Sequence, residues 1–292
     1  MCRLLIYTVH KAASTFLHQI TSKLSREFSF DYYSIHHDQY YAEIKTGSWR
    51  EFLKTHSRPG TGFGPIRAGA ADPCFPDDLA TYTVVLHLRD PRDVLTSLYF
   101  SQTYSHPRKE GRFNPTDVQR SAWENQGVDS FVLQMAPLFQ RRYQELCTHL
   151  LGKSNVVLVK YEDLVLRYQL WLEQIFQPFV EFPVREQTRL GLWRYQKKLV
   201  QIQTELYEAH RNDFYCSKED ITQHKRQITP GDHRRKLQTS TIRYLNELFE
   251  TELKLLGYAD ENWKTQHGGV SVESSAGNKT HSRPSWGCGA FG

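Results

Sequence analysis

The sequence predicts an α/β fold: a single domain with an open parallel β-sheet flanked by helices. Short, near-continuous apolar runs alternate with stretches of helical periodicity along the chain. Apolar runs without polar alternation indicate strands that are buried on both faces, as in parallel sheets. Strands separated by helices indicate βαβ units, in which helices cover both faces of the sheet.

Three runs are strong strand candidates, and two weaker candidates lie near Tyr32–Ile35 and near Ile66. The strong candidates are Arg3–Val9, Thr83–Leu88 and Asn155–Lys160. In open parallel sheets, ligands bind at the carboxyl ends of the strands. The residues that follow each strand are therefore the candidate functional residues.

Helical spacing of apolar residues predicts four helices. Asp90 is a predicted N-cap because Pro follows it at the first helical position, and Gly257 is a predicted stop. The predicted helices are Ser14–Phe28, Pro91–Tyr104, Phe131–Leu151 and Thr239–Leu256.

The 292 residues are enough for one elaborated α/β domain, which we expect over residues 1–258. Residues 259–292 are rich in Gly, Ser, His and Asn without periodicity, and we expect a flexible C-terminal tail there. An aromatic content of 13% excludes disorder of the whole chain. No apolar run suits a membrane-spanning helix, and Met1–Val9 lacks the features of a signal peptide. We therefore expect a cytoplasmic protein with no membrane partner.

The charged residues and cysteines set further limits on function. A net charge of +5 is too modest to indicate a nucleic-acid partner, but it suits an anionic ligand if the cations converge. The five cysteines are scattered and form no CxxC pair, which indicates neither a zinc site nor a disulfide framework. The spacing of the other side chains suggests no metal site either.

The first predicted strand runs directly into a loop with a cation and two hydroxyls, His10–Phe16, followed by a helix. Ala12 and Ala13 are small enough for close backbone approach, and a helix N-terminus offers N–H groups to an anion. With Lys11 and the adjacent hydroxyls, the loop is a candidate phosphate cradle. The alternative is an ordinary turn with Ser14 as N-cap. The loop lacks the nucleoside-triphosphate signature GxxxxGK[ST].

A second candidate phosphate site follows the strand that ends at Leu88. Arg89 leaves that strand, and Ser97 lies on the next helix. An Arg fork and a hydroxyl can bind a second phosphate. The alternative is a surface salt bridge of Arg89 or Arg92 with Asp93.

Four segments together resemble sulfotransferases that use 3′-phosphoadenosine 5′-phosphosulfate (PAPS). The loop resembles that family's Lys-Ser-Gly-Thr-Thr-Trp, and the Arg89 to Ser97 segment resembles its Arg-x7-Ser. The other two resemble its Tyr-Glu-Asp-Leu and its C-terminal Arg-Lys-Gly-x-x-Gly-Asp-Trp. In this sequence, the four segments are Lys11–Phe16, Arg89–Ser97, Tyr161–Leu164 and Arg226–His233. The resemblance implies a P-loop-like fold, PAPS as donor, adenosine 3′,5′-bisphosphate (PAP) as product and no required metal.

The resemblance also implies roles for individual residues. Lys11 would be catalytic, and it would bind the 5′-phosphosulfate together with Ala12, Ala13, Ser14 and Thr15. Phe16 and Tyr161 would contact adenine, and Arg89, Ser97 and Arg226 would bind the 3′-phosphate. The sequence departs from the family at Ala13 (usually Gly), Phe16 (usually Trp), Gln227 and Ile228. For Tyr161, a core tyrosine followed by helix-capping Glu162 and Asp163 is an equal alternative.

A general base should accept the proton of the acceptor. The histidine that many relatives carry is absent from the corresponding stretch, about 66–70, whereas His36 and His37 follow the weak second strand. An imidazole suits this role, and we favour His37 slightly over His36. If both are surface histidines, Asp38, Glu43 or His106 could serve, or an acidic acceptor could need little help.

The acceptor is expected to be a small molecule. The stretches 40–63, 99–113 and 193–215 are rich in aromatic and basic residues and are candidate walls of its pocket. We expect sulfation of a hydroxyl rather than an amine or carbamoyl nitrogen, as in natural-product tailoring, and a homodimer is compatible with the sequence. The rival functions are a nucleotide-dependent phosphotransferase and a non-catalytic nucleotide-binding relative.

Overall fold

The computed structural model describes residues 3–34, 49–67, 75–105, 115–180, 189–214 and 228–259. These residues belong to one unit that ends at Asp260. The predicted tail, residues 259–292, lies almost wholly outside the described residues, so the domain division stays a prediction.

Five parallel strands form one sheet in the order β2-β3-β1-β4-β5, as the apolar runs predict. Because β1 is central and every neighbouring pair is parallel, the chain crosses over between strands by way of helices. The strands are β1 (Arg3–Thr8), β2 (Asp31–Tyr33), β3 (Thr61–Arg67), β4 (Tyr82–Leu88) and β5 (Val156–Lys160).

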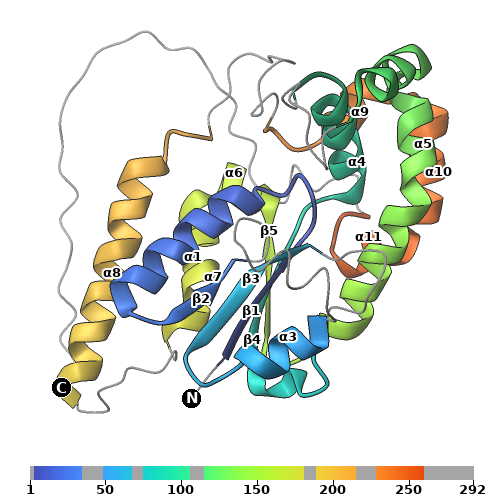
Figure 1. Cartoon of the computed structure of the whole chain (residues 1–292). Helices are drawn as coiled ribbons and strands as arrows, with labels where there is room; N and C mark the ends of the chain where they lie inside the picture. The colour runs from blue at the N-terminus through green and yellow to red at the C-terminus, as the bar shows by residue number, and fades with distance from the viewer. Residues whose placement is uncertain are drawn as a thin grey trace, which may run out of the picture. The chain divides into compact units, whose positions relative to one another are not determined.

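Helices connect the strands and follow the last one (Figure 1). Those that precede β5 are α1 (Ser14–Phe28), α3 (Trp49–His56), the 3₁₀ turn η1 (Leu79–Thr81), α4 (Pro91–Phe100), the π-helical turn η2 (Ser101–Ser105) and α5 (Asp117–Leu150). Those that follow β5 are α6 (Tyr161–Leu166), α7 (Tyr168–Val180), α8 (Arg189–His210), α9 (Asp232–Lys236), α10 (Thr239–Leu248) and α11 (Glu250–Leu255).

Three of the four predicted helices have different bounds in the structure. The helix predicted to start at Phe131 begins at Asp117, because Gly127 (φ 77°, ψ 170°) breaks the periodicity that sequence reading depends on. The helix predicted over Pro91–Tyr104 ends at Phe100 and continues as the π-helical turn. Phe249 divides the last predicted helix into α10 and α11.

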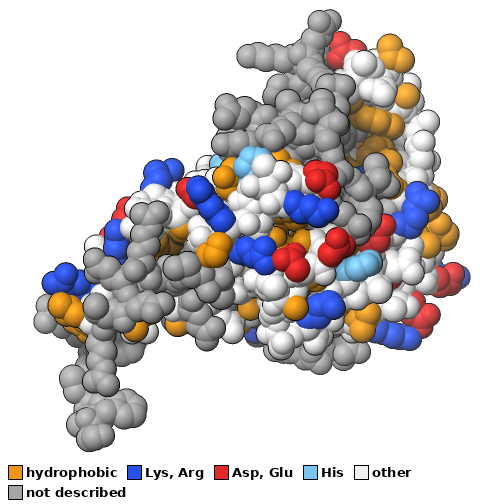
Figure 2. All heavy atoms as spheres, turned by 60° about the horizontal axis from the view of Figure 1, so that its bottom comes forward, with side chains coloured by type: hydrophobic (Ala, Val, Ile, Leu, Met, Phe, Trp, Pro, Cys, Tyr) orange, Lys and Arg blue, Asp and Glu red, His pale blue; other side chains and the backbone are white. Residues whose placement is uncertain are grey.

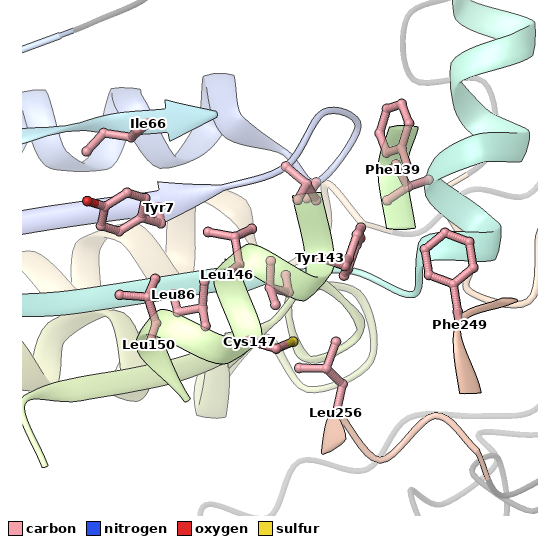
Figure 3. Packing of buried hydrophobic residues seen from close by; sticks show 14 of the residues in the cluster. Tyr7, Ile66, Leu86, Phe139, Tyr143, Leu146, Cys147, Leu150, Phe249 and Leu256 are labelled. Atoms are coloured by element: carbon pink, nitrogen blue, oxygen red, sulfur yellow. The ribbon is translucent and has the colours of Figure 1, made fainter. Parts of the chain in front are cut away.

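Both faces of the sheet are covered. Leu4 and Ile6 of β1 pack with α1, α6, α7 and α8, whereas Leu5 and Tyr7 pack with α4, α5, α10 and α11. Figure 1 shows α1, α7 and α8 on one side of the strands and α5, α10 and α11 on the other. Figure 3 shows the hydrophobic cluster that contains Leu5 and Tyr7, in which Tyr143 and Leu146 of α5 lie between the sheet and the C-terminal helices. This double layer explains why the strand runs are almost entirely apolar.

The edge of the sheet where the strands begin carries charges that neutralise one another. Arg3 of β1 pairs with Asp78 at 2.6 Å, and Arg58 before β3 pairs with Asp31 at 2.7 Å. Figure 2 brings this edge forward and shows Lys and Arg side chains interspersed with Asp and Glu. The opposite edge, where the strands end, carries a different set of side chains.

Candidate functional site

The register of the sheet brings the carboxyl ends of four strands, β1, β3, β4 and β5, to one edge. Thr8 at the end of β1 pairs with Arg67 on one side and with His87 on the other. Leu88 in turn pairs with Lys160, the last residue of β5. The loop after β1, the loop after β4 and the start of α6 therefore lie at the same edge, as the sequence predicts.

Arg89 and the loop after β1 are in direct contact. The guanidinium Nη1 of Arg89 donates to the backbone carbonyl of Lys11 at 2.8 Å. Beneath the loop, Trp171 donates to Nε2 of His87 at 3.0 Å, and burial lowers the pKa of His87 to about 3. His87 is thus a neutral hydrogen-bond acceptor in the core, and it helps to hold the floor of the loop.

The side chain of Lys11 reaches across to the end of α4. Its Nζ donates to Oγ of Ser101 at 2.9 Å, and Ser101 is buried in the π-helical turn. Ser97, the predicted phosphate-binding hydroxyl, lies one helical turn earlier on α4 and is half-buried. The Lys11 ammonium and the two serines therefore belong to the same corner of the carboxyl edge.

Arg89 is 2% exposed, yet its hydrogen-bonding capacity is mostly unused. Its guanidinium lies over the ring of Tyr161, 4.3 Å from the centroid. Nε and Nη2 are buried without a hydrogen-bond partner among the described residues. Buried guanidinium donors without a partner cost free energy, so this side chain suits an anionic ligand.

Arg67 is a further cation at this edge that sequence reasoning missed. Nη2 of Arg67, the last residue of β3, donates to Oγ of Ser14 at 2.8 Å. Burial lowers the pKa of Arg67 from its ordinary, very high value, so its charge persists at neutral pH. Its place at the carboxyl end of a strand, within the stretch where many relatives carry a histidine, was the signal that could have identified it. Ser14 is not the N-cap; that position belongs to Ala13.

Hydrogen bonds join the segment that begins at Ile228 to Tyr161 and to Asp93, two residues near Arg89. Tyr161 donates from its hydroxyl to the carbonyl of Ile228 at 3.1 Å. At the other end, the Asp93 carboxylate accepts from the backbone N–H of Gly231 at 2.6 Å and from that of His233 at 2.9 Å. The predicted alternative, a surface ion pair with Asp93, is wrong. Asp93 is fully buried.

Of the remaining predicted residues, Phe16, Thr15 and Ala12 belong to the described part of the chain, and six others do not. Phe16 lies in an aromatic cluster, stacked on Trp171 with ring centroids 5.7 Å apart and edge-on to Phe214 at 5.4 Å. Thr15 is exposed in the first turn of α1, and Ala12 is buried below it. Six predicted residues lie outside the described part of the chain: His36, His37, Asp38, Glu43, His106 and Arg226.

A family model described as the sulfotransferase domain matches residues 2–257, nearly the whole chain. The chain belongs to the sulfotransferase family. This confirms the family and the fold that the four ordered motifs predict.

Among solved structures, the chain is similar to mouse sulfotransferase SULT7A1, crystallised as a complex with PAP. That match has 13% identity and a TM-score of 0.50, and it covers 89% of this chain and 90% of the mouse chain. Retinol dehydratase, crystallised with androsterone and the inactive cofactor PAP, matches at 12% identity with a TM-score of 0.38, over 86% and 80% of the two chains. At these identities, the mouse enzyme supports the sulfotransferase fold alone. No curated protein sequence matches the chain.

The described residues of this sulfotransferase contain neither a candidate membrane-spanning helix nor a candidate group of metal ligands. No helix among the described residues has both the length and the apolar composition needed to cross a bilayer. Within the same residues, no three His, Cys, Asp or Glu side chains gather as the ligands of a metal ion would.

Ala13 stands where the sulfotransferase pattern has glycine, and its backbone conformation is one that favours glycine. Its φ of 55° lies in the left-handed region, which strains an alanine by roughly 1–2 kcal/mol. We expect Ala13→Gly to raise the free energy of unfolding by about 0.5–1 kcal/mol, because the relieved strain exceeds the added entropy of the unfolded chain. Denaturant unfolding measures this. The matched change Ala12→Gly removes a fully buried methyl at an ordinary φ and should destabilise. If Ala13→Gly and Ala12→Gly lowered the free energy of unfolding equally, the inferred backbone strain at Ala13 would be contradicted.

Glu162 beside this site predicts a pH dependence of stability. Burial raises the pKa of Glu162 to about 7, although the Tyr258 hydroxyl (2.6 Å) and the Asp90 N–H (3.0 Å) both donate to its carboxylate. The folded pKa is above the ordinary value of 4.5. The folded protein therefore binds the proton more tightly, and this contribution to stability is lost as pH rises from about 4.5 through about 7.

We expect Glu162→Gln, which keeps the shape and can still accept from the Asp90 N–H while its NH2 donates to a reoriented Tyr258 hydroxyl, to flatten this part of the stability profile. The comparison is the denaturation midpoint across about pH 5 to 8, where the wild-type protein should lose up to roughly 3 kcal/mol. Glu205→Gln, on the exposed side of α8, is the control and should leave the slope unchanged. An unchanged slope in Glu162→Gln would show that another group titrates.

Proposed function

We propose that this sulfotransferase transfers the sulfuryl group of PAPS to a hydroxyl of a small-molecule acceptor by in-line displacement. The observation that carries the proposal is the contact between Arg89 and the Lys11 loop, together with the two Arg89 donors that have no hydrogen-bond partner among the described residues. A donor with phosphates at both ends needs two separate cationic sites, and PAPS has this form. PAP in the mouse relative supports the same nucleotide.

The residues at the carboxyl edge fit such a nucleotide. Nε and Nη2 of Arg89 would donate to the 3′-phosphate, with Ser97 and Arg226 as further ligands. Phe16 and Tyr161 would supply faces for the adenine. Lys11 and Arg67 would neutralise the 5′ end, where the loop residues Ala12, Ala13, Ser14 and Thr15 bring backbone N–H groups and hydroxyls close.

Catalysis in this proposal is electrostatic. When the acceptor oxygen attacks sulfur, the S–O bond to the 5′-phosphate breaks and negative charge grows on the bridging oxygen. Lys11 is the group that stabilises this charge, because its ammonium lies on the loop that opens α1 and already bonds Ser101. The helix N-terminus adds the same sign of potential without a proton transfer.

The acceptor's proton would go to His37 or His36. We propose His37, with Asp38, Glu43 and His106 as the next candidates. The variants His36→Ala and His37→Ala test this assignment: loss of turnover by about 100-fold in only one of them identifies the base. Full activity in both variants contradicts it.

The acceptor would lie against aromatic walls that partly belong to the described residues. Phe100 and Tyr104, both half-buried, have ring centroids 6.1 Å apart, and both rest on the buried ring of Tyr99. Flat apolar rings suit an aromatic or polycyclic alcohol. We propose a cytoplasmic enzyme of small-molecule metabolism, such as natural-product tailoring, with no nucleic-acid or membrane partner and with a homodimer as its assembly.

Calorimetric titration of the full chain with PAP, and separately with ATP and Mg²⁺, tests the donor. Binding of PAP but not of ATP supports the proposal, whereas the reverse favours a phosphotransferase and contradicts it. Sulfate transfer from PAPS to a panel of phenols, alcohols and amines then tests the reaction. PAP binding without transfer to any acceptor would favour the non-catalytic relative.

A further inference from the structure

His87 is a buried histidine of β4 that the proposed mechanism does not use. It is 0% exposed, and it pairs in the sheet with Thr8, the last residue of β1 before the Lys11 loop. Trp171 of α7 donates from Nε1 to Nε2 of His87 at 3.0 Å. Burial lowers the pKa of His87 to about 3, so the imidazole is uncharged around neutral pH.

The indole of Trp171 decides which nitrogen of this imidazole carries the proton. A neutral imidazole has one N–H donor and one acceptor nitrogen. Because Nε2 of His87 accepts from Trp171, the proton of the neutral ring must be on Nδ1. His87 therefore presents one fixed N–H donor, at Nδ1.

The backbone carbonyl of Ala12 is the group that faces this donor. It acts on the imidazole as a hydrogen-bond acceptor and opposes the fall in the pKa of His87. Nδ1 is buried, and no described residue meets the distance and angle of a full hydrogen bond with it. The contact with Ala12 is thus long or bent, and it is the contact through which His87 supports the loop.

An inward-facing Ala12 carbonyl directs the next backbone N–H outward. The C=O and the N–H of one peptide unit point in opposite directions, because the unit is planar and trans. The unit that starts with the Ala12 carbonyl ends with the N–H of Ala13, the N-cap residue of α1. With the carbonyl facing His87 in the core, this N–H points away from the core, toward the carboxyl edge of the sheet.

The end of β4 holds the preceding peptide unit of the loop in the same way. Nη1 of Arg89 donates to the Lys11 carbonyl at 2.8 Å, which directs the N–H of Ala12 away from Arg89. Lys11 and Ala13 have φ values of 63° and 55°, and this left-handed conformation strains residues other than glycine. Contacts from His87 and Arg89 to two consecutive carbonyls stabilise this strained backbone.

We propose that His87 is a positioning residue of the donor site: its Nδ1–H holds the Ala12 carbonyl so that the N–H of Ala13 points at the 5′-phosphosulfate of PAPS. The inference rests on the proposed function, since the phosphosulfate is the anion that this N–H would meet. Negative charge grows there as the S–O bond breaks, and a preorganised N–H stabilises that charge more than it stabilises the ground state. His87 is fully buried, so it acts on turnover through the loop and not by touching the nucleotide.

Two amide variants separate the two contacts of His87, because each places an amide near one ring nitrogen. The amide of asparagine reaches the position of Nδ1, and that of glutamine reaches the position of Nε2. His87→Asn keeps a donor for the Ala12 carbonyl and loses the Trp171 contact, whereas His87→Gln keeps the Trp171 contact and loses the donor. Each variant gives up one buried contact, so we expect similar losses in stability.

Turnover is expected to differ between the two variants. At saturating PAPS, with the best acceptor from the panel of phenols, alcohols and amines, kcat should fall about 10- to 100-fold in His87→Gln and less than about threefold in His87→Asn. The PAP dissociation constant, measured on the same proteins, should rise by a smaller factor than kcat falls. Equal losses of kcat in both variants, or a larger loss in His87→Asn, would make His87 a core residue only and overturn the inference.

The tautomer can be measured in the wild-type chain, even if neither variant folds. In the full chain labelled with ¹⁵N-histidine, we expect the imidazole of His87 to stay neutral at about pH 5 and to carry its proton on Nδ1. A proton on Nε2, or a charged ring at that pH, would overturn the inference and leave the proposed function intact. A wild-type chain that neither binds PAP nor transfers sulfuryl groups from PAPS would contradict the proposed function, and this role of His87 with it.

Discussion

Lys11→Ala is expected to lower the rate of sulfuryl transfer by about 100- to 1,000-fold, the usual loss when one preorganised donor to developing charge is removed. The ammonium acts on the bond that breaks, so the loss should appear in kcat more than in the affinity for PAP. Arg89 bonds the backbone carbonyl of residue 11, not its side chain, and alanine keeps that contact. Steady-state kinetics and a PAP titration on the same variant separate the two effects.

Lys23→Ala provides the control for Lys11→Ala. Lys23 lies on α1, the helix that follows the Lys11 loop, but its ammonium pairs with Glu205 at 3.1 Å on the exposed side of α8. Its removal lowers the net charge equally and should leave kcat within a factor of about two, since exposed ion pairs contribute little. If Lys11→Ala keeps wild-type turnover, or if both variants lose it equally, Lys11 is not the catalytic cation.

The fold was accessible from the sequence because the parallel sheet is buried on both faces. That burial makes β1, β4 and β5 continuous apolar runs, and their parallel direction places the segments that follow them at one edge. Helix bounds were less accessible where a backbone feature interrupts a periodic pattern. Gly127 divides the long helix α5 into parts that read as separate segments, and Phe249 divides the last one.

The candidate site was only partly predictable, for a different reason. Lys11, Arg89 and Tyr161 each directly follow a strand and are carried by recognisable motifs. Arg67 joins them through the strand order, because β3 is the neighbour of β1 although a long stretch of chain separates the two. The Asp93–His233 pair links residues 140 positions apart. Such a contact leaves no local pattern in one sequence.

Replacing Arg89 by methionine is expected to remove recognition of the 3′-phosphate at a smaller cost in stability than the loss of a fully engaged buried arginine. The side chain donates one hydrogen bond, to Lys11, and leaves two buried donors without partners among the described residues. Methionine removes that unsatisfied polarity and fills most of the volume, but buried Asp93 loses one of its nearby cations, so we expect the free energy of unfolding to fall by about 1–2 kcal/mol. The PAP dissociation constant should rise roughly 100-fold or more, from two charged hydrogen bonds lost. Affinity for adenosine 5′-monophosphate should change little.

Arg92→Met makes the matched comparison, three residues along the chain. Arg92 is also buried, but its guanidinium is fully engaged: it pairs with Asp90 at 2.7 Å and donates to Asn246 and to the carbonyl of Tyr258. Its removal leaves the Asp90 carboxylate buried and unpaired, which should cost about 3–5 kcal/mol of unfolding free energy. A binding site holds its charged donors open for a ligand, whereas a structural site uses them within the fold. If Arg89→Met destabilised the protein as much as Arg92→Met and left PAP binding unchanged, Arg89 would be a structural residue and the proposed donor site would be wrong.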